Sequence, residues 1–279
     1  MIIALFTNTT KQQYQELSLG VIEFFKTHNV TIVMEEKQAE EFNTKKISAV
    51  NPLDIHCIIS MGGDGTILQL VHHYPNITAP ILGINLGHLG FMADIPISDI
   101  YPSLTDLLNG HYKVHNRLMI DGESVLKQKC FAVNDIVIHR AQNPSLIELA
   151  IHVDGVYVNT FEADGIIVST PNGSTAYSLA AGGPILSPGL DALVVTPISA
   201  HTISNRPIVL TADQEIQIQY LSEYGPVEVR ADGLDQFFLK TGETFKISRS
   251  QKKFRLISLD RIDYFSTLRS KLGWSGKLR

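Results

Sequence analysis

The chain has 279 residues, of which 44% are hydrophobic and 18% are charged, and its formal net charge is -5. This length allows one large domain or two ordinary ones with substantial cores, and the composition excludes a largely disordered chain. The acidic balance gives no basic surface for nucleic acid, so no nucleic-acid partner is expected. No apolar run approaches the roughly 20 residues of a membrane helix, so no membrane association is expected.

Two cysteines, Cys57 and Cys130, each lie in an apolar, strand-like run. This placement predicts buried, reduced thiols rather than a disulfide, which suits a reducing compartment. The N-terminal MIIALFT has no basic region before its apolar residues, so it does not resemble a signal peptide. We therefore expect a cytoplasmic protein.

The first third of the chain alternates strand-like and helix-like patterns. Residues 14–28 predict an amphipathic helix with Leu17, Val21, Ile22 and Phe25 on one face. Short apolar strands separated by helices are typical of a parallel α/β domain. The strands are expected at residues 1–7, 30–34, 54–61 and 79–85, and a second helix at 66–74.

The rest of the chain is patterned mainly with period two, which predicts a β-rich domain with few helices. Around Asp154-Gly155, apolar residues alternate with polar or small ones on both sides, as in a β-hairpin. Strand-like stretches are found at residues 129–140, 146–161, 215–221, 226–233 and 243–248.

The pentapeptide GGDGT follows a predicted strand and precedes a predicted helix. Its glycines Gly62, Gly63 and Gly65 permit left-handed backbone and leave main-chain N–H groups uncovered, so phosphate oxygens can approach them. The helix that starts near Thr66 adds the partial positive charge of its N-terminus. Asp64 would repel a bare phosphate, so it is either a general base for an attacking hydroxyl or a ligand of a divalent cation. The structural alternative is a tight turn in which Asp64 caps the helix.

The segment STPNGSTAYSLAAGGPI, at residues 169–185, combines turn signals with hydroxyl groups and little side-chain bulk. Ser174 and Thr175 can start a helix that runs through Tyr177, Leu179 and Ala180. Thr175, Tyr177 and Ser178 offer hydroxyls, and Ala176 leaves room for a flat ring close to the backbone. Such a surface suits a nucleotide, with contacts to ribose and base and little charge. The alternative is a capped helix in a β-rich domain.

The pair Asn134-Asp135 interrupts an apolar strand with two adjacent polar residues. Neighbouring residues of a strand point to opposite faces, so both are comfortable only where the strand lines a cleft. An amide beside a carboxylate can recognise ribose hydroxyls or an adenine edge. The alternative is the end of a strand at a bend.

Taken together, these segments resemble the NAD kinase family. The resemblance rests on GGDGT, LGINLGHLGF at 82–91, Asn134-Asp135, the segment 169–185 and DYFSTLRSKLGW at 263–274, in the family's order. GGDGT also occurs in lipid kinases, so the segment 169–185 carries most of the specificity.

The resemblance implies a Rossmann-like α/β domain with the GGDGT loop at 1–113, a β-sandwich-like NAD-binding domain at 114–262, and a basic tail at 263–279 that packs back on the first domain. It implies transfer of the γ-phosphoryl group of ATP to the 2′-hydroxyl of the adenosine ribose of NAD. A divalent cation, Mg²⁺, is implied as well, bound mainly through the phosphates of ATP. Self-association as a homodimer or homotetramer is also implied, and inorganic polyphosphate stays open as a donor.

By position, Asp64 resembles the general base of the family. Asn134 and Asp135 resemble the pair that contacts the adenosine part of NAD, and Asp164 resembles a residue on the nicotinamide side. The other implied contacts with NAD or ATP are Gly62, Gly63, Gly65, Thr66, His88, Phe91, Ser145, Glu162, Thr175, Ala176, Tyr177, Ser178, Leu179 and Ala180.

Three positions depart from the family pattern. Asp135 stands where relatives frequently have a glutamate, so its side chain is shorter by one methylene. Glu162 stands where many relatives have a basic residue, and Ser145 where some have a histidine. The preference for oxidised or reduced dinucleotide therefore stays open. Two other functions compete with an NAD kinase: a GGDGT-type kinase for a lipid or sugar phosphate, and a dinucleotide sensor without catalytic activity.

Overall fold

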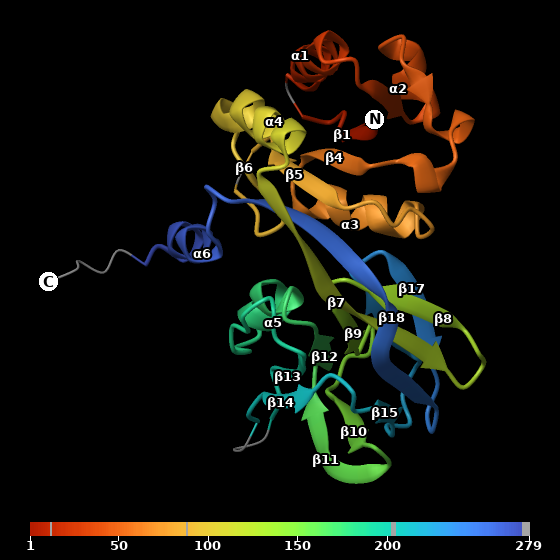
Figure 1. Cartoon of the computed structure of the whole chain (residues 1–279). Helices are drawn as coiled ribbons and strands as arrows, with labels where there is room; N and C mark the ends of the chain where they lie inside the picture. The colour runs from red at the N-terminus through yellow and green to blue at the C-terminus, as the bar shows by residue number, and fades with distance from the viewer. Residues whose placement is uncertain (12, 88, 202–204, 275–279) are drawn as a thin grey trace, which may run out of the picture. The chain divides into compact units, whose positions relative to one another are not determined.

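The computed structural model describes residues 1–11, 13–87, 89–201 and 205–274. The chain divides into two compact units: unit 1 consists of Met1–Asn116 with Arg255–Arg279, and unit 2 of Arg117–Phe254. Two long strands, β7 (Tyr112–Ser124) and β18 (Thr244–Leu259), contribute residues to both units. Figure 1 labels most of the helices and strands that are used below, though not β2, β3 and β16.

Unit 1 contains a parallel sheet with the strand order β5-β4-β1-β2-β3. β6 also pairs in parallel with β5, and so does the end of β18, through Leu256 and Ile81. This is the parallel α/β arrangement that the alternating pattern predicts. The strands are β1 Ile2–Thr7, β2 Thr31–Met34, β3 Lys45–Lys46, β4 Cys57–Gly62, β5 Ile81–Asn85 and β6 Ala93–Ile95.

Helices cover both faces of this sheet. Val21 and Phe25 of α1, with Leu104 of α4, share a buried cluster with alternate strand residues such as Ile3 and Leu5. α3 lies on the other side of the sheet (Figure 1). The helices of unit 1 are α1 Tyr14–Thr27, α2 Glu36–Glu41, α3 Asp64–His73, α4 Ile100–Asn109 and α6 Tyr264–Leu272, with short 3-10 turns η1 Ile47–Ala49, η2 Pro52–Asp54 and η3 Ile97–Asp99.

Unit 2 consists of two sheets of antiparallel strands that share one core. One has the order β14-β13-β12-β9-β16-β17, and the other has the order β11-β10-β15-β18, continued by β7 and β8. Alternate residues of both, such as Leu149 and Ile138, point into the same cluster, as in a β-sandwich. The elements are β8 Lys129–Ala132, β9 Asp135–His139, β10 Ile147–Val153, β11 Val156–Ala163, β12 Gly165–Ser169, η4 Gly173–Thr175, α5 Tyr177–Ala180, β13 Ala192–Ile198, β14 Ile208–Thr211, β15 Ile216–Tyr220, β16 Val227–Ala231 and β17 Asp235–Leu239.

The predicted fold class is confirmed, and so is the hairpin at Asp154-Gly155, where both residues have left-handed backbone. Two local predictions were wrong. The expected strand at 129–140 is two strands, because the chain bends between Ala132 and Asp135. The expected helix after Ser174 is interrupted at Ala176, whose φ of -102° and ψ of -127° are not helical.

The two thiols of the chain are buried and free, as the sequence predicts. Burial raises the pKa of Cys57 to about 12, and chiefly burial does the same for Cys130, so both stay protonated at neutral pH. Within the described ranges, no helix is long and apolar enough to cross a membrane.

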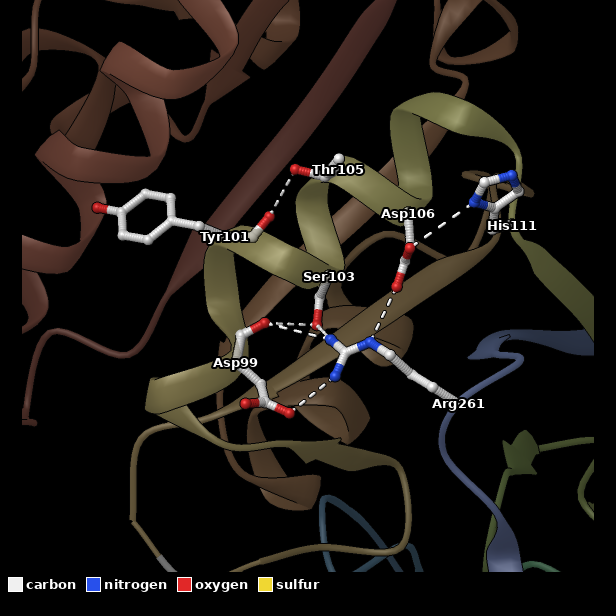
Figure 2. A network of polar contacts seen from close by, with 7 residues as sticks. All are labelled: Asp99, Tyr101, Ser103, Thr105, Asp106, His111 and Arg261. Atoms are coloured by element: carbon white, nitrogen blue, oxygen red, sulfur yellow. Dashed lines mark hydrogen bonds and ion pairs between the residues drawn. The ribbon is translucent and has the colours of Figure 1, made fainter.

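Arg261, which follows β18, binds side chains in and just before α4 (Figure 2). The Arg261 guanidinium donates to carboxylate oxygens of Asp99 at 2.8 Å and Asp106 at 2.9 Å, and also to the hydroxyl of Ser103. Asp106 in turn lies 3.8 Å from the ring of His111. A planar guanidinium that bridges two carboxylates holds both in one geometry, so this network joins the residues that follow β18 to α4 and the turn before it.

We expect Arg261→Ala to lower the free energy of unfolding by about 1 kcal/mol, because the bonds are charge-assisted but partly exposed to solvent. Urea unfolding of the variant beside the wild type measures this. Arg206→Ala, which removes an exposed arginine from unit 2, serves as the control. Equal stability of the two variants would contradict an anchoring role for Arg261.

Candidate active site

The GGDGT turn joins the end of β4 to the start of α3. None of Gly62, Gly63 and Gly65 has left-handed backbone, so the conformational freedom that glycine permits is not used in this turn. Gly62 is needed for close packing, since a Cβ there would lie 2.2 Å from the Thr66 hydroxyl oxygen. Apart from neighbouring main chain, nothing lies within 4 Å of where a Cβ on Gly63 or Gly65 would be, so a ligand can approach the chain there.

Asp64 is the first residue of α3, and its carboxylate is held by another segment of unit 1. One oxygen accepts from the N–H of Met92 at 3.0 Å and of Ala93 at 2.8 Å, and the other from the N–H of Phe91 at 2.8 Å. Gly90 makes room for it, because a Cβ there would lie 1.9 Å from a carboxylate oxygen. A carboxylate accepts about four hydrogen bonds, so about one acceptor position is left.

Thr66 and Phe91 have supporting contacts in unit 1. The Thr66 hydroxyl accepts from the N–H of Gly63 at 3.3 Å, which satisfies a donor at the start of α3. The Phe91 ring lies 6.2 Å from the ring of Tyr264, and the Lys271 ammonium lies 4.6 Å from its centroid. Phe91 therefore binds helix α6 of the tail. His88, which the resemblance also implies, lies outside the described residues.

Unit 2 contains a cavity of about 620 Å³. Five residues expected from the sequence line it: Asn134, Asp135, Asp164, Ala176 and Tyr177. Eight further residues complete the lining: Val137, His139, Arg140, Ala141, Ile198, Arg230, Asp232 and Gly233.

Some of the missed residues had a signal in the sequence. Asp135, Val137 and His139 are alternate residues of β9, so they share one face of the strand. Arg230 had no such signal, because it enters the lining only through the pairing of β16 with β9, which sets it opposite Val137.

Asn134 is held tightly by the 169–185 segment. Its carbonyl oxygen accepts from the N–H of Thr170 at 2.8 Å, and its side-chain oxygen accepts from the amide of Asn172 at 2.8 Å. A Cβ on Gly173 would lie 2.2 Å from that carbonyl oxygen, so only glycine fits there. Asn134 therefore lines the cavity with both its main-chain carbonyl and its side-chain oxygen held.

Asp135 is only 6% exposed. Burial, with a smaller contribution from the charge of Asp232, raises the pKa of the Asp135 carboxyl to about 7. Near neutral pH this side chain is therefore either a donor or an acceptor of hydrogen bonds, which is unusual for an aspartate.

The cationic groups of the cavity are paired with carboxylates. Arg140 lies 2.7 Å from a carboxylate oxygen of Asp164. Glu228, which is buried, accepts from Arg230 at 2.5 Å and lies 3.4 Å from the ring of His139. Burial lowers the pKa of His139, which favours its neutral form at neutral pH. The lining thus carries charges of both signs in fixed positions.

The other expected contacts are not part of the cavity lining. Ser145 and Glu162 are exposed, and the Thr175 hydroxyl donates to the carbonyl of Asn172 at 3.2 Å. Ser178 is fully buried, and its hydroxyl bonds that of Thr196 at 2.9 Å. Of the last two residues of α5, Leu179 is half-buried and Ala180 is exposed.

Comparison with known proteins identifies the chain's relatives. The models of the ATP-NAD kinase N-terminal domain and the ATP-NAD kinase C-terminal domain match residues 3–112 and 133–259. An NAD kinase of Protochlamydia amoebophila (strain UWE25) is 56% identical over 278 residues, covering 100% of both chains. An NAD kinase of Moorella thermoacetica (strain ATCC 39073 / JCM 9320) is 35% identical, covering 98% of this chain and 90% of that one.

Two solved structures are similar along the whole chain. Yeast NADH kinase complexed with NADH has a TM-score of 0.86 and 25% identity, covering 100% of this chain and 89% of that one. An NAD kinase from Archaeoglobus fulgidus in complex with ATP has a TM-score of 0.78 and 25% identity, covering 99% of this chain and 100% of that one.

These matches place the chain among the phosphotransferases that act on a nucleotide. It belongs to the ATP-NAD kinase family, and it catalyses the ATP-dependent phosphorylation of NAD. The sequence-based prediction of an NAD kinase is confirmed, against the lipid kinase and the non-catalytic sensor.

We expect Gly90→Ala to lower the free energy of unfolding by about 1–3 kcal/mol, because the new methyl group displaces the Asp64 carboxylate from its three N–H donors. Urea unfolding measures the loss. Gly63→Ala is the matched control, since its methyl group would meet open space at a φ of -143° that any residue adopts. If the two variants were equally stable, the Asp64 contacts would not be important for the fold.

The raised pKa of Asp135 predicts a pH-dependent stability. The folded state keeps the proton up to about pH 7, whereas the unfolded chain loses it near the ordinary value of 3.8. Stability from this group is therefore present at low pH and is lost as the pH rises toward about 7. We expect Asp135→Asn to gain stability relative to the wild type between about pH 4 and pH 7, in urea unfolding. If the difference in the free energy of unfolding between variant and wild type were constant over this range, the prediction would be contradicted.

Proposed function

We propose that the chain transfers the γ-phosphoryl group of ATP to the 2′-hydroxyl of the adenosine ribose of NAD, with Asp64 as the general base. The observation that carries the proposal is the Asp64 carboxylate. Three main-chain N–H groups hold it in place at the start of α3, and about one acceptor position is left for a hydroxyl.

A ribose hydroxyl is a poor nucleophile at neutral pH, so its proton must leave as its oxygen attacks phosphorus. In the proposed step, a bond forms between this oxygen and the γ-phosphorus, the bond to the leaving ADP oxygen breaks, and Asp64 takes the proton. The N-terminus of α3 and the uncrowded main chain of Gly63 and Gly65 would face the phosphate charge.

NAD is proposed to occupy the cavity of unit 2. Asn134 and Asp135 would contact its adenosine part, Asp164 its nicotinamide side, and Tyr177 would offer a ring wall. The NADH in the yeast structure and the ATP in the Archaeoglobus structure support a dinucleotide and a nucleoside triphosphate as the two ligands. Ser178 would support this wall from the core instead of contacting NAD, because its hydroxyl is already bonded to Thr196.

We propose that Mg²⁺ arrives with ATP, held mainly by the phosphates. The described residues contain no group of three or more His, Cys, Asp or Glu side chains that could hold a metal ion by themselves. This fits a cation that is part of the substrate, where it shields the phosphate charge.

Self-association as a homodimer or homotetramer is proposed as well. Strand β11 lies at the edge of its sheet, and its residues Val156, Tyr157 and Val158 are 68%, 57% and 41% exposed. Three successive exposed apolar side chains on an edge strand suit burial against a second copy of the chain.

A cytoplasmic location is also proposed, supported by the free thiols of Cys57 and Cys130.

We expect Asp64→Asn to bind NAD but to lose turnover by about 100-fold or more, because the amide cannot accept the hydroxyl proton. A coupled assay of NADP formation with NAD, ATP and magnesium measures turnover, and calorimetric titration measures NAD binding. Asp54→Asn, an exposed carboxylate of the same unit, is the control. Near-normal turnover of Asp64→Asn would remove Asp64 from the role of base.

A further inference from the structure

The residue of most interest outside the proposed catalytic step is Asp232, in the turn that joins β16 to β17. Asp232 and Gly233 both have left-handed backbone, with φ of 50° and 70°, and Leu234 closes the turn with a hydrogen bond from its N–H to the carbonyl of Ala231 at 2.9 Å. Aspartate, asparagine and glycine tolerate this conformation, so the turn by itself does not need a carboxylate.

The Asp232 carboxylate binds three successive main-chain N–H groups of the segment that joins β8 to β9. It accepts from Val133 at 2.8 Å, from Asn134 at 2.7 Å and from Asp135 at 3.2 Å. The N–H of Asp232 also donates to the carbonyl of Asp135 at 2.9 Å. One side chain therefore fixes the donors of the whole segment, and bonds to a charged acceptor are the stronger kind.

The same segment is fixed from its other side by Thr170. The Thr170 hydroxyl donates to the carbonyl of Val133 at 2.6 Å, and its N–H donates to the carbonyl of Asn134 at 2.8 Å. Asp232 thus holds the three N–H groups and the carbonyl of Asp135, and Thr170 holds the carbonyls of Val133 and Asn134. With both sets engaged, the main chain is fixed, and with it the directions in which the Cα–Cβ bonds of Asn134 and Asp135 leave the strand.

We propose that Asp232 is a positioning residue for NAD: by holding the main chain of residues 133–135, it sets the directions of the Asn134 and Asp135 side chains in the cavity and so the affinity for the adenosine end of NAD. The proposal rests on the proposed function, in which this pair contacts adenosine. A carboxylate in the lining of a cavity for an anionic dinucleotide would be unfavourable if it were unpaired. Its three N–H donors spread its charge and turn it toward the main chain.

The test is Asp232→Asn, assayed for NADP formation with NAD and ATP varied separately. Asparagine keeps the left-handed turn. Its NH₂ group, however, takes the place of a carboxylate oxygen that accepted a hydrogen bond from a main-chain N–H, so two donors face each other. We expect the KM for NAD to rise about tenfold or more. A hydrogen bond to a charged acceptor shifts an equilibrium by about that factor, so without it residues 133–135 leave the arrangement that binds NAD. The KM for ATP should change less than about twofold. Amide hydrogen exchange at residues 133–135 should become faster.

Asp154→Asn is the matched control. Asp154 has the same left-handed backbone, with φ of 50°, precedes Gly155 in the β10–β11 hairpin, and accepts from the N–H of Glu215 at 2.9 Å. It is a turn carboxylate that holds the main chain, but it does not line the cavity. We expect this variant to keep the wild-type KM for NAD.

Three results would overturn the proposal. An unchanged KM for NAD in Asp232→Asn contradicts it directly. Equal rises of both KM values, together with a lower melting temperature, would show a general structural role instead. If the wild type itself makes no NADP, the proposed function fails and takes this role of Asp232 with it. The first and third results are distinguishable: if the wild type makes NADP and Asp232→Asn has the wild-type KM for NAD, only the role of Asp232 is contradicted.

Discussion

The candidate site depends on one interaction that occurs twice, a carboxylate that accepts hydrogen bonds from three successive main-chain N–H groups. Asp64 holds residues 91–93 in this way, and Asp232 holds residues 133–135. Loop N–H groups that lack a partner in a sheet or helix must find one elsewhere, because an unpaired buried donor is costly. A single carboxylate satisfies three of them and fixes the loop at the same time. In both units the segment that carries or adjoins the site is therefore ordered by an acid that is distant in sequence.

Close packing of glycine against these segments completes the arrangement. Gly90 leaves the space that the Asp64 carboxylate occupies, and Gly173 lies against the main chain of Asn134. At both positions the backbone is ordinary, so the absence of a side chain matters for space and not for conformation. The glycines of the GGDGT turn also have ordinary backbone, and they too matter for space. Gly62 packs closely on Thr66, and Gly63 and Gly65 leave room beside the main chain.

The cavity of unit 2 depends on the order of strands in one sheet. β9 lies between β12 and β16, so its residues gain neighbours from both sides that are far along the chain. Arg140 meets Asp164, which follows β11, and Asp135 meets Asp232 from the turn after β16. The resulting environment, and not Asp135 itself, moves the pKa of its carboxyl to about 7.

Local patterns in the sequence were sufficient for the fold class, most of the strands, the hairpin at Asp154-Gly155 and the GGDGT turn between strand and helix, because periodicity and turn residues act over a few neighbours. The motifs also led to Asn134, Asp135, Asp164 and Tyr177 in the cavity lining. Only the tertiary structure revealed what holds these residues. Asp232 enters through strand pairing, and the partners of Asp64 come from a loop that no periodicity marks. Such contacts join segments far apart in the chain, and a sequence pattern carries no information about which distant main-chain donor a carboxylate will find.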